Sequence, residues 1–136
     1  MTEYENELKE AFPEVDPGIR PFGSRVLVQI KTPKTKTKSG LFLGNDLVEI
    51  EKWNTQTAKV ISLGPLAFKN RDTMKAWPEG DWCKPGDFVR VGKYGGDRFE
   101  VPFEKDSDDC ALFVVFNDLD IIGDVYSNPL EIKAFL

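Results

Sequence analysis

The chain has 136 residues, of which 40% are hydrophobic and 30% charged, enough for one compact domain with a core. Its net charge of −5 argues against a basic body that binds nucleic acid through phosphates. The longest apolar run, Cys110–Phe116, has seven residues, whereas a membrane-spanning helix needs roughly 20. The acidic N-terminus also lacks the basic and apolar regions of a secretory signal. These features predict a chain with no membrane or nucleic-acid partner.

The residue types needed for common catalytic sites are missing. Histidine is absent, which excludes His-based triads and most catalytic zinc sites. Cys83 and Cys110 form no CxxC pair, and they favour a reduced cytoplasmic chain with buried thiols over a disulfide scaffold. The sequence therefore predicts a protein that is not an enzyme and has no cofactor or metal site.

Residues 1–18 form an acidic N-terminal extension. The first 16 residues hold six acids and one base, which accounts for the whole net charge. Tyr4, Leu8 and Phe12 recur at helical intervals until Pro13 ends the pattern. A helix of about ten residues is marginal in water unless it docks on a surface. Two interpretations remain open: a partly ordered acidic tail, or a helix that contacts a neighbouring molecule.

Short strands separated by turn signals follow. Period-two alternation and β-rich composition predict six of them, with no helix in the body of the domain. They are Arg25–Ile30, Thr57–Leu63, Phe88–Val91, Arg98–Val101, Cys110–Phe116 and Leu119–Val125. This pattern predicts an all-β fold, either a small barrel or a sandwich.

Two stretches interrupt the strands. Residues 31–56 open with four spaced lysines and contain Leu41, Phe42 and Leu43 between two glycines. Three adjacent apolar side chains in a loop need a surface that buries them. The stretch is either a hairpin tip that folds back on the core or a mobile segment that orders in a partner's groove. Residues 67–82 are polar with two tryptophans and are interpreted as a surface excursion.

Five motifs, in this order, resemble those of the GroES-like co-chaperonins. They are Arg20–Val28, Gly40–Leu43, Lys59–Gly64, Lys84–Val89 and Asn117–Val125. The resemblance covers about residues 19–125. The extensions 1–18 and 126–136 have no counterpart in compact bacterial members and are similar to the elaborations of phage-encoded members.

The resemblance implies an irregular β-barrel with a long mobile loop at about residues 31–56. Such subunits assemble as a seven-membered ring, a homo-oligomer that caps an ATP-driven, GroEL-like chaperonin around an unfolded client protein. The setting would be the cytoplasm, that of the host if a phage encodes the chain. The residues implied to bind the apical domains of the chaperonin are Gly40, Leu41, Phe42 and Leu43.

The resemblance also implies how subunits would join. The stretch Ile19–Arg25 would pair with the last strand of the neighbouring subunit, which closes a ring and protects exposed edges. The implied interface residues are Ile19, Arg20, Pro21, Val26, Leu119, Ile121, Ile122 and Val125. Apolar residues between Leu130 and Leu136 either extend this seam or belong to a disordered end.

One alternative from another class is an OB-like barrel that binds single-stranded nucleic acid. The lysines of residues 31–38 would follow the phosphates, and Phe22, Phe42 or Trp53 would stack on bases. The neutral charge of the chain after residue 16 weighs against it. An enzyme related to the GroES-like domain of alcohol dehydrogenases would need zinc ligands and a nucleotide domain, both missing from this sequence.

Overall fold

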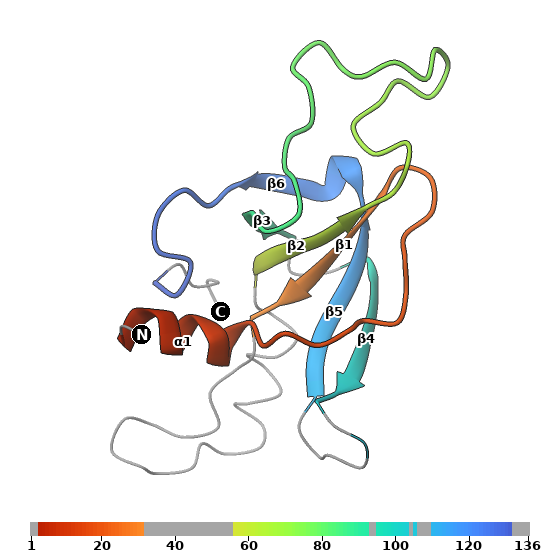
Figure 1. Ribbon diagram of the computed structural model, residues 1–136. Coiled ribbons are helices and arrows are strands. Elements are labelled where there is room, and N and C mark those ends of the chain that lie inside the picture. Colours follow the sequence, from red (N-terminus) through yellow and green to blue (C-terminus); the bar gives the residue numbers. More distant parts are fainter. Residues whose placement is uncertain (1–2, 32–55, 93–94, 104, 106–109, 132–136) are drawn as a thin grey trace.

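One six-stranded antiparallel sheet forms the body of the described part of the molecule (Figure 1). The computed structural model describes residues 3–31, 56–92, 95–103, 105 and 110–131. A short helix, α1 (Glu3–Ala11), precedes strands β1 (Arg25–Ile30), β2 (Thr57–Leu63), β3 (Phe88–Val91), β4 (Asp97–Pro102), β5 (Cys110–Asn117) and β6 (Ile121–Asp124). The strand order is β4-β5-β1-β2-β3-β6, so β4 and β6 lie at the two edges. The predicted all-β fold is confirmed.

The first three strands begin and end where the sequence predicts them. β4 and β5 are slightly longer than predicted, and the last strand begins later than predicted. Its expected first residues, Leu119 and Asp120, belong to a 3₁₀ turn, η1 (Asp118–Asp120). The buried Asp118 carboxylate accepts the backbone N–H of Leu119 at 2.9 Å and that of Phe68 at 3.0 Å. These bonds hold the turn and tie it to a segment 50 residues away.

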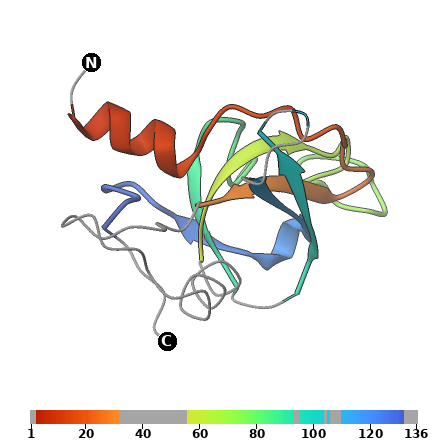
Figure 2. The same cartoon turned by 90° about the horizontal axis from the view of Figure 1, so that it is seen from below.

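The strands curve around a common interior (Figure 2). β1 contributes Val26, Val28 and Ile30 to this inner core, as its alternation predicts, and all three are at most 1% exposed. At the end of β2 the backbone passes very close to the segment before β1. A Cβ on Gly64 would lie 2.3 Å from the carbonyl oxygen of Gly23, so only glycine fits there.

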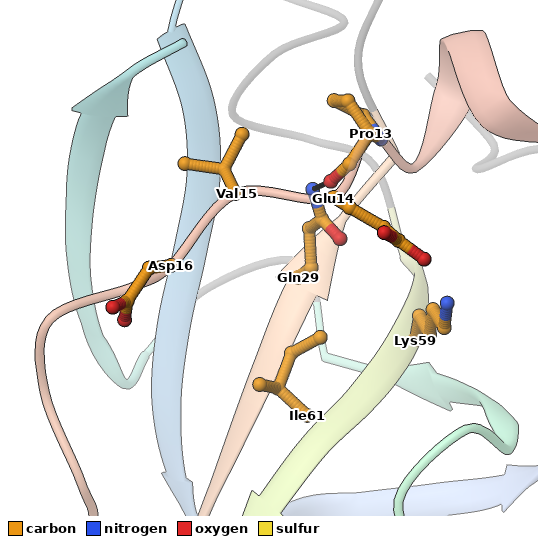
Figure 3. Close-up of a pocket in the computed structure, with 7 residues that line it drawn as sticks. All are labelled: Pro13, Glu14, Val15, Asp16, Gln29, Lys59 and Ile61. Carbon is orange, nitrogen blue, oxygen red and sulfur yellow. Dashed lines mark hydrogen bonds between the residues drawn. The ribbon is translucent and has the colours of Figure 1, made fainter. Parts of the chain in front are cut away.

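The opposite, outer face of the sheet is also apolar. Leu27, Ala111 and Phe113 are at most 1% exposed there, although an antiparallel barrel normally leaves its outer face in water. Residues 12–16, here called the N-terminal strap, cross this face (Figure 3). Val15 packs against the outer cluster. The buried Gln29 donates its side-chain N–H to the Pro13 carbonyl at 2.7 Å.

The helix α1 is fixed to the sheet at its C-terminal end. Ala11 and Phe12 are 7% and 4% exposed, and the Phe12 ring meets Phe88 edge-on with ring centres 5.1 Å apart. Acidic side chains in the first turn and Lys9 in the last suit the helix dipole. The N-terminal extension therefore packs on its own protomer.

The predicted surface excursion is wrong for its first residues. Ala67 and Phe68 are 4% and 0% exposed and belong to the inner core. The Phe68 ring contacts Trp77 and Trp82, whose own ring centres are 5.0 Å apart. Phe68 and the half-buried Trp77 thus extend the core, Trp82 packs on them and stays 39% exposed, and most of the polar residues face water.

Cys83 belongs to the same inner core as Phe68, and its side chain is buried. Burial, reinforced by the carboxylates of Asp87, Asp81 and Asp124, raises the pKa of Cys83 to about 11 from 9.0. The thiolate is the reactive form of cysteine, so this side chain is chemically inert at neutral pH. Both Cys83 and Cys110 are free thiols.

We expect Phe12→Ala to lower the free energy of unfolding by about 3 kcal/mol, because it removes a buried ring from the contact that holds α1 and the strap. Met74→Ala is the control, since Met74 is an apolar residue that is 57% exposed, and its cost should stay below about 0.5 kcal/mol. Urea unfolding followed by circular dichroism measures both. Equal costs would show that the strap does not stabilise the fold.

We expect the stability of the protein to fall as the pH rises from 9 to 11, in part because of Cys83. Over this range the unfolded chain loses the thiol proton while the folded chain keeps it, so the unfolded state binds fewer protons. The contribution is at most about 2–3 kcal/mol. Urea midpoints are measured across this pH range for the parent protein and for Cys83→Ala. The difference between the two profiles separates the contribution of Cys83 from that of lysine and tyrosine titration. Parallel pH profiles for the two proteins would contradict it.

Candidate functional site

Exposed apolar side chains gather on the segment before β1 and around β6. Ile19, Phe22, Leu119, Ile122 and Tyr126 are between 45% and 93% exposed. Isolated exposed apolar residues are ordinary, but several along two neighbouring segments mark an interaction surface. We call these five residues the apolar seam.

The outer edge of β6 is unpaired within the described part of this protomer. β6 pairs with β3 on one side, with Arg90 opposite Gly123, and it is the last strand of the sheet. An unpaired edge presents free backbone N–H and C=O groups that can accept another strand. Ile122 lies on this edge strand, Leu119 lies in the turn that precedes it, and both side chains are exposed.

A hollow of about 440 Å³ lies beside the segment that precedes β1. Residues 19–22 line one side, and the start of β4 and the end of β5 line the other. Arg20, Arg25, Asp97 and Asp120 bring both signs of charge to its rim. The lining of the hollow therefore combines apolar side chains with charges of both signs.

The backbone around this hollow is set by turns. Gly23 adopts φ +61°, which favours glycine, and the Arg25 N–H bonds to the Phe22 carbonyl at 3.2 Å. Asp118 donates its backbone N–H to Ser24 at 3.0 Å, which joins η1 to the same turn. This arrangement leaves Phe22 exposed and keeps Pro21 buried.

The residues predicted for the subunit interface divide into two groups. Val26 and Ile121, at 0% and 4% exposure, lie in the inner core of their own protomer and are not part of the exposed surface. Ile19, Arg20, Leu119 and Ile122 are exposed, Pro21 is buried and lines the hollow, and Val125 is half-buried. The stretch 19–24 forms no strand in this protomer.

Sequence reasoning did not assign two residues of the apolar seam to the interface. In the sequence, Phe22 lies in the motif Arg20–Val28 and has a base-stacking role in the OB-like alternative, and Tyr126 lies in the C-terminal extension. Their exposed fractions, 80% and 93%, are the largest among the exposed large hydrophobic residues of the described chain. An aromatic residue beside a predicted interface motif was the signal available in the sequence.

The predicted partner-binding residues Gly40, Leu41, Phe42 and Leu43 lie outside the described residues. The structure does describe the residues that flank them. The Lys31 N–H bonds to the Thr57 carbonyl at 3.3 Å, so the chain leaves β1 and enters β2 at adjacent points. Any segment between them starts and ends at one edge of the molecule.

The described side chains offer little chemistry for catalysis or metal binding. Within residues 3–31, 56–92, 95–103, 105 and 110–131, no three His, Cys, Asp or Glu side chains are placed to hold a metal ion. Burial lowers the pKa of Arg98 from its ordinary value. No helix in the described chain is both long and apolar enough to cross a bilayer.

A second hollow, of about 270 Å³, lies between the N-terminal strap and the sheet (Figure 3). The strap residues 13–16 line one wall, and Gln29, Lys59 and Ile61 line the other. Gln29 is already bonded to Pro13, so the hollow reflects how the strap rests on the sheet.

Comparison with known proteins identifies the family. The family model described as "Chaperonin 10 Kd subunit" matches residues 18–125. The co-chaperonin GroES of Rhodothermus marinus is 28% identical over 105 residues, covering 77% of this chain and 89% of that protein.

The co-chaperonin GroES of Methylacidiphilum infernorum is 34% identical over 90 residues, covering 66% of this chain and 83% of that protein. The co-chaperonin GroES of Caldicellulosiruptor saccharolyticus is 32% identical over 87 residues, covering 64% of this chain and 82% of that protein. None of these relatives is named as a nucleic-acid-binding protein, so the OB-like alternative finds no support. The chain, with its apolar seam and its single antiparallel sheet, belongs to the chaperonin 10 kDa subunit family.

Proposed function

We propose that this protein is a co-chaperonin that caps a GroEL-type chaperonin and closes a chamber around an unfolded client protein. The match of residues 18–125 to the chaperonin 10 kDa family carries the proposal. The function requires no reaction by this chain, in keeping with a sequence that has no histidine. The proposed setting is the cytoplasm, where chaperonin and client meet.

Contact with the chaperonin is assigned to Gly40, Leu41, Phe42 and Leu43. Burying the three large side chains would contribute about 1.5–3 kcal/mol each. Ordering the segment around them costs about 2–5 kcal/mol. One copy would therefore bind weakly, at about millimolar strength once orientational losses are included.

A ring of subunits raises the overall affinity for the chaperonin, although each single contact is weak. After one subunit binds, the others bind intramolecularly, which multiplies the affinity by about 10²–10⁴ or more. Because each contact stays weak, the cap can leave when the chaperonin changes shape. The proposed assembly is a heptamer, as the family resemblance implies.

The apolar seam is the proposed subunit interface. Its two halves, residues 19–22 and residues 119–126, differ in structure, so they fit a head-to-tail contact that closes into a ring. In that contact the edge of β6 would receive the segment 19–24 of a neighbour, which forms no strand within its own protomer. Pairing would satisfy backbone groups on both sides and cover Leu119 and Ile122.

We expect replacement of Leu41, Phe42 and Leu43 by serine to abolish ATP-dependent binding to a GroEL-type chaperonin, since the proposed apolar contact is lost. Circular dichroism and native mass spectrometry should show the same fold and ring as in the parent protein. The control replaces two exposed apolar residues outside the seam and the extensions, Met74 and Phe103, by serine and should bind normally. Unchanged binding by the first variant would refute the assignment.

We expect the pair Leu119→Asp and Ile122→Asp to dissociate the ring, because it buries two charges at the proposed interface. Native mass spectrometry measures the subunit number directly. Met74→Asp with Phe103→Asp adds the same charges at exposed sites away from the seam and should leave the ring intact. A parent protein that is monomeric at micromolar concentration would disprove assembly through this surface.

A further inference from the structure

The two terminal extensions both reach the base of the segment 32–55. Residues 3–17 and 126–131 fall outside the region matched by the family. We propose that these extensions act as positioning elements, which hold the chain where it enters the segment 32–55, while β3 holds the chain where it leaves. The proposal rests on the proposed function, in which that segment carries the chaperonin contact.

The exit from the segment is fixed through Gln56. Its carbonyl accepts the Val91 N–H at 2.8 Å, and its side-chain amide donates to the Val91 carbonyl at 3.1 Å. Arg90 donates to the Gln56 side-chain oxygen at 2.9 Å. Three hydrogen bonds therefore join this residue to β3, which belongs to the family-matched part of the chain.

The entrance to the segment is held by the C-terminal extension. The Lys31 ammonium group donates to the Leu130 carbonyl at 3.3 Å. That carbonyl belongs to a tight turn, in which the Asn128 side chain accepts the Leu130 N–H at 2.9 Å and the Asn128 carbonyl accepts the Glu131 N–H at 3.1 Å. Pro129 in the same turn is buried. The turn thus presents a fixed acceptor to Lys31.

The N-terminal strap covers the same side of β1. Side chains alternate along a strand, so Leu27, Gln29 and Lys31 share the outer face. Val15 of the strap packs against the cluster that contains Leu27, Pro13 of the strap bonds to Gln29, and the C-terminal turn bonds to Lys31. The two extensions therefore cover successive residues of β1 up to the point where the segment begins.

A second connection joins the extensions to each other through β3. The Phe12 ring packs against Phe88, and the Phe88 carbonyl accepts the Val125 N–H at 2.9 Å. The residue that leads into the C-terminal extension is thus fixed to the residue on which the N-terminal strap rests. Figure 1 shows α1 and the chain after β6 on the same side of the sheet.

Fixed ends change how tightly the segment binds. Ends that are already ordered lose less conformational entropy on binding, so affinity rises without any new contact with the partner. Each hydrogen bond at the base contributes about 0.5–1.5 kcal/mol, which corresponds to a twofold to tenfold change in an equilibrium. The extensions would therefore set the residence time of the cap on the chaperonin.

The test compares Lys31→Met with a chain truncated after Ser127, alone and combined. Lys31→Met removes the donor and keeps the aliphatic stem, while truncation removes the acceptor turn. We expect each to raise amide exchange of Lys31 and Thr57 about twofold to tenfold and to speed release from the chaperonin by a similar factor. Lys69→Met is the matched control, since Lys69 donates to the Pro65 carbonyl at 2.9 Å far from this base.

The variant that combines Lys31→Met with the truncation tests whether Lys31 and the C-terminal turn act through the same contact. If the Lys31–Leu130 contact carries the effect, the double change exchanges no faster than the truncation alone. Additive effects, or exchange and release equal to those of the Lys69→Met control, would overturn the proposal. Failure of every protein, the parent included, to bind a chaperonin would instead refute the proposed function, while the exchange measurement would still test the contact.

Discussion

The structure depends on β1 being buried on both faces and paired on both edges. Its inner side chains fill the interior between β2 and β5, and its outer side chains would face water in an ordinary antiparallel barrel. Covering that outer face requires additional chain, and the N-terminal strap provides it. An extension that composition alone marks as an acidic tail is therefore part of the packed domain, and its helix is ordered because its last residues are buried.

The sequence predicts most strands well because their signals are local. β1, β2 and β3 combine period-two alternation with turn residues at their ends, such as Gly64 and the turn before Phe88. The motif order along these strands also carried the family assignment, which the family match confirms. The candidate partner-binding residues follow from the same motif order, and they remain a prediction because they lie outside the described residues.

Features that arise from long-range contacts were not predictable from local patterns. The late start of β6 reflects Asp118, whose carboxylate bonds to Phe68 far along the chain. Burial of Phe68 itself depends on Trp77 and Trp82, which fold over it from a stretch with polar composition. For the subunit interface, the resemblance implies Val26, but this side chain is buried in the inner core among residues from other strands, which a local motif does not reveal.

The shared position of the two extensions bears on how the protein can be labelled. An affinity tag or fluorescent fusion joined ahead of α1 or behind Glu131 would crowd the side of the sheet where the segment 32–55 is attached (Figure 1). The turn at Asn70–Lys75 projects from the opposite side and is held by its own side chain, with the Asn70 oxygen accepting the Asp72 N–H at 2.8 Å. A small epitope inserted there keeps the reporter away from that attachment point.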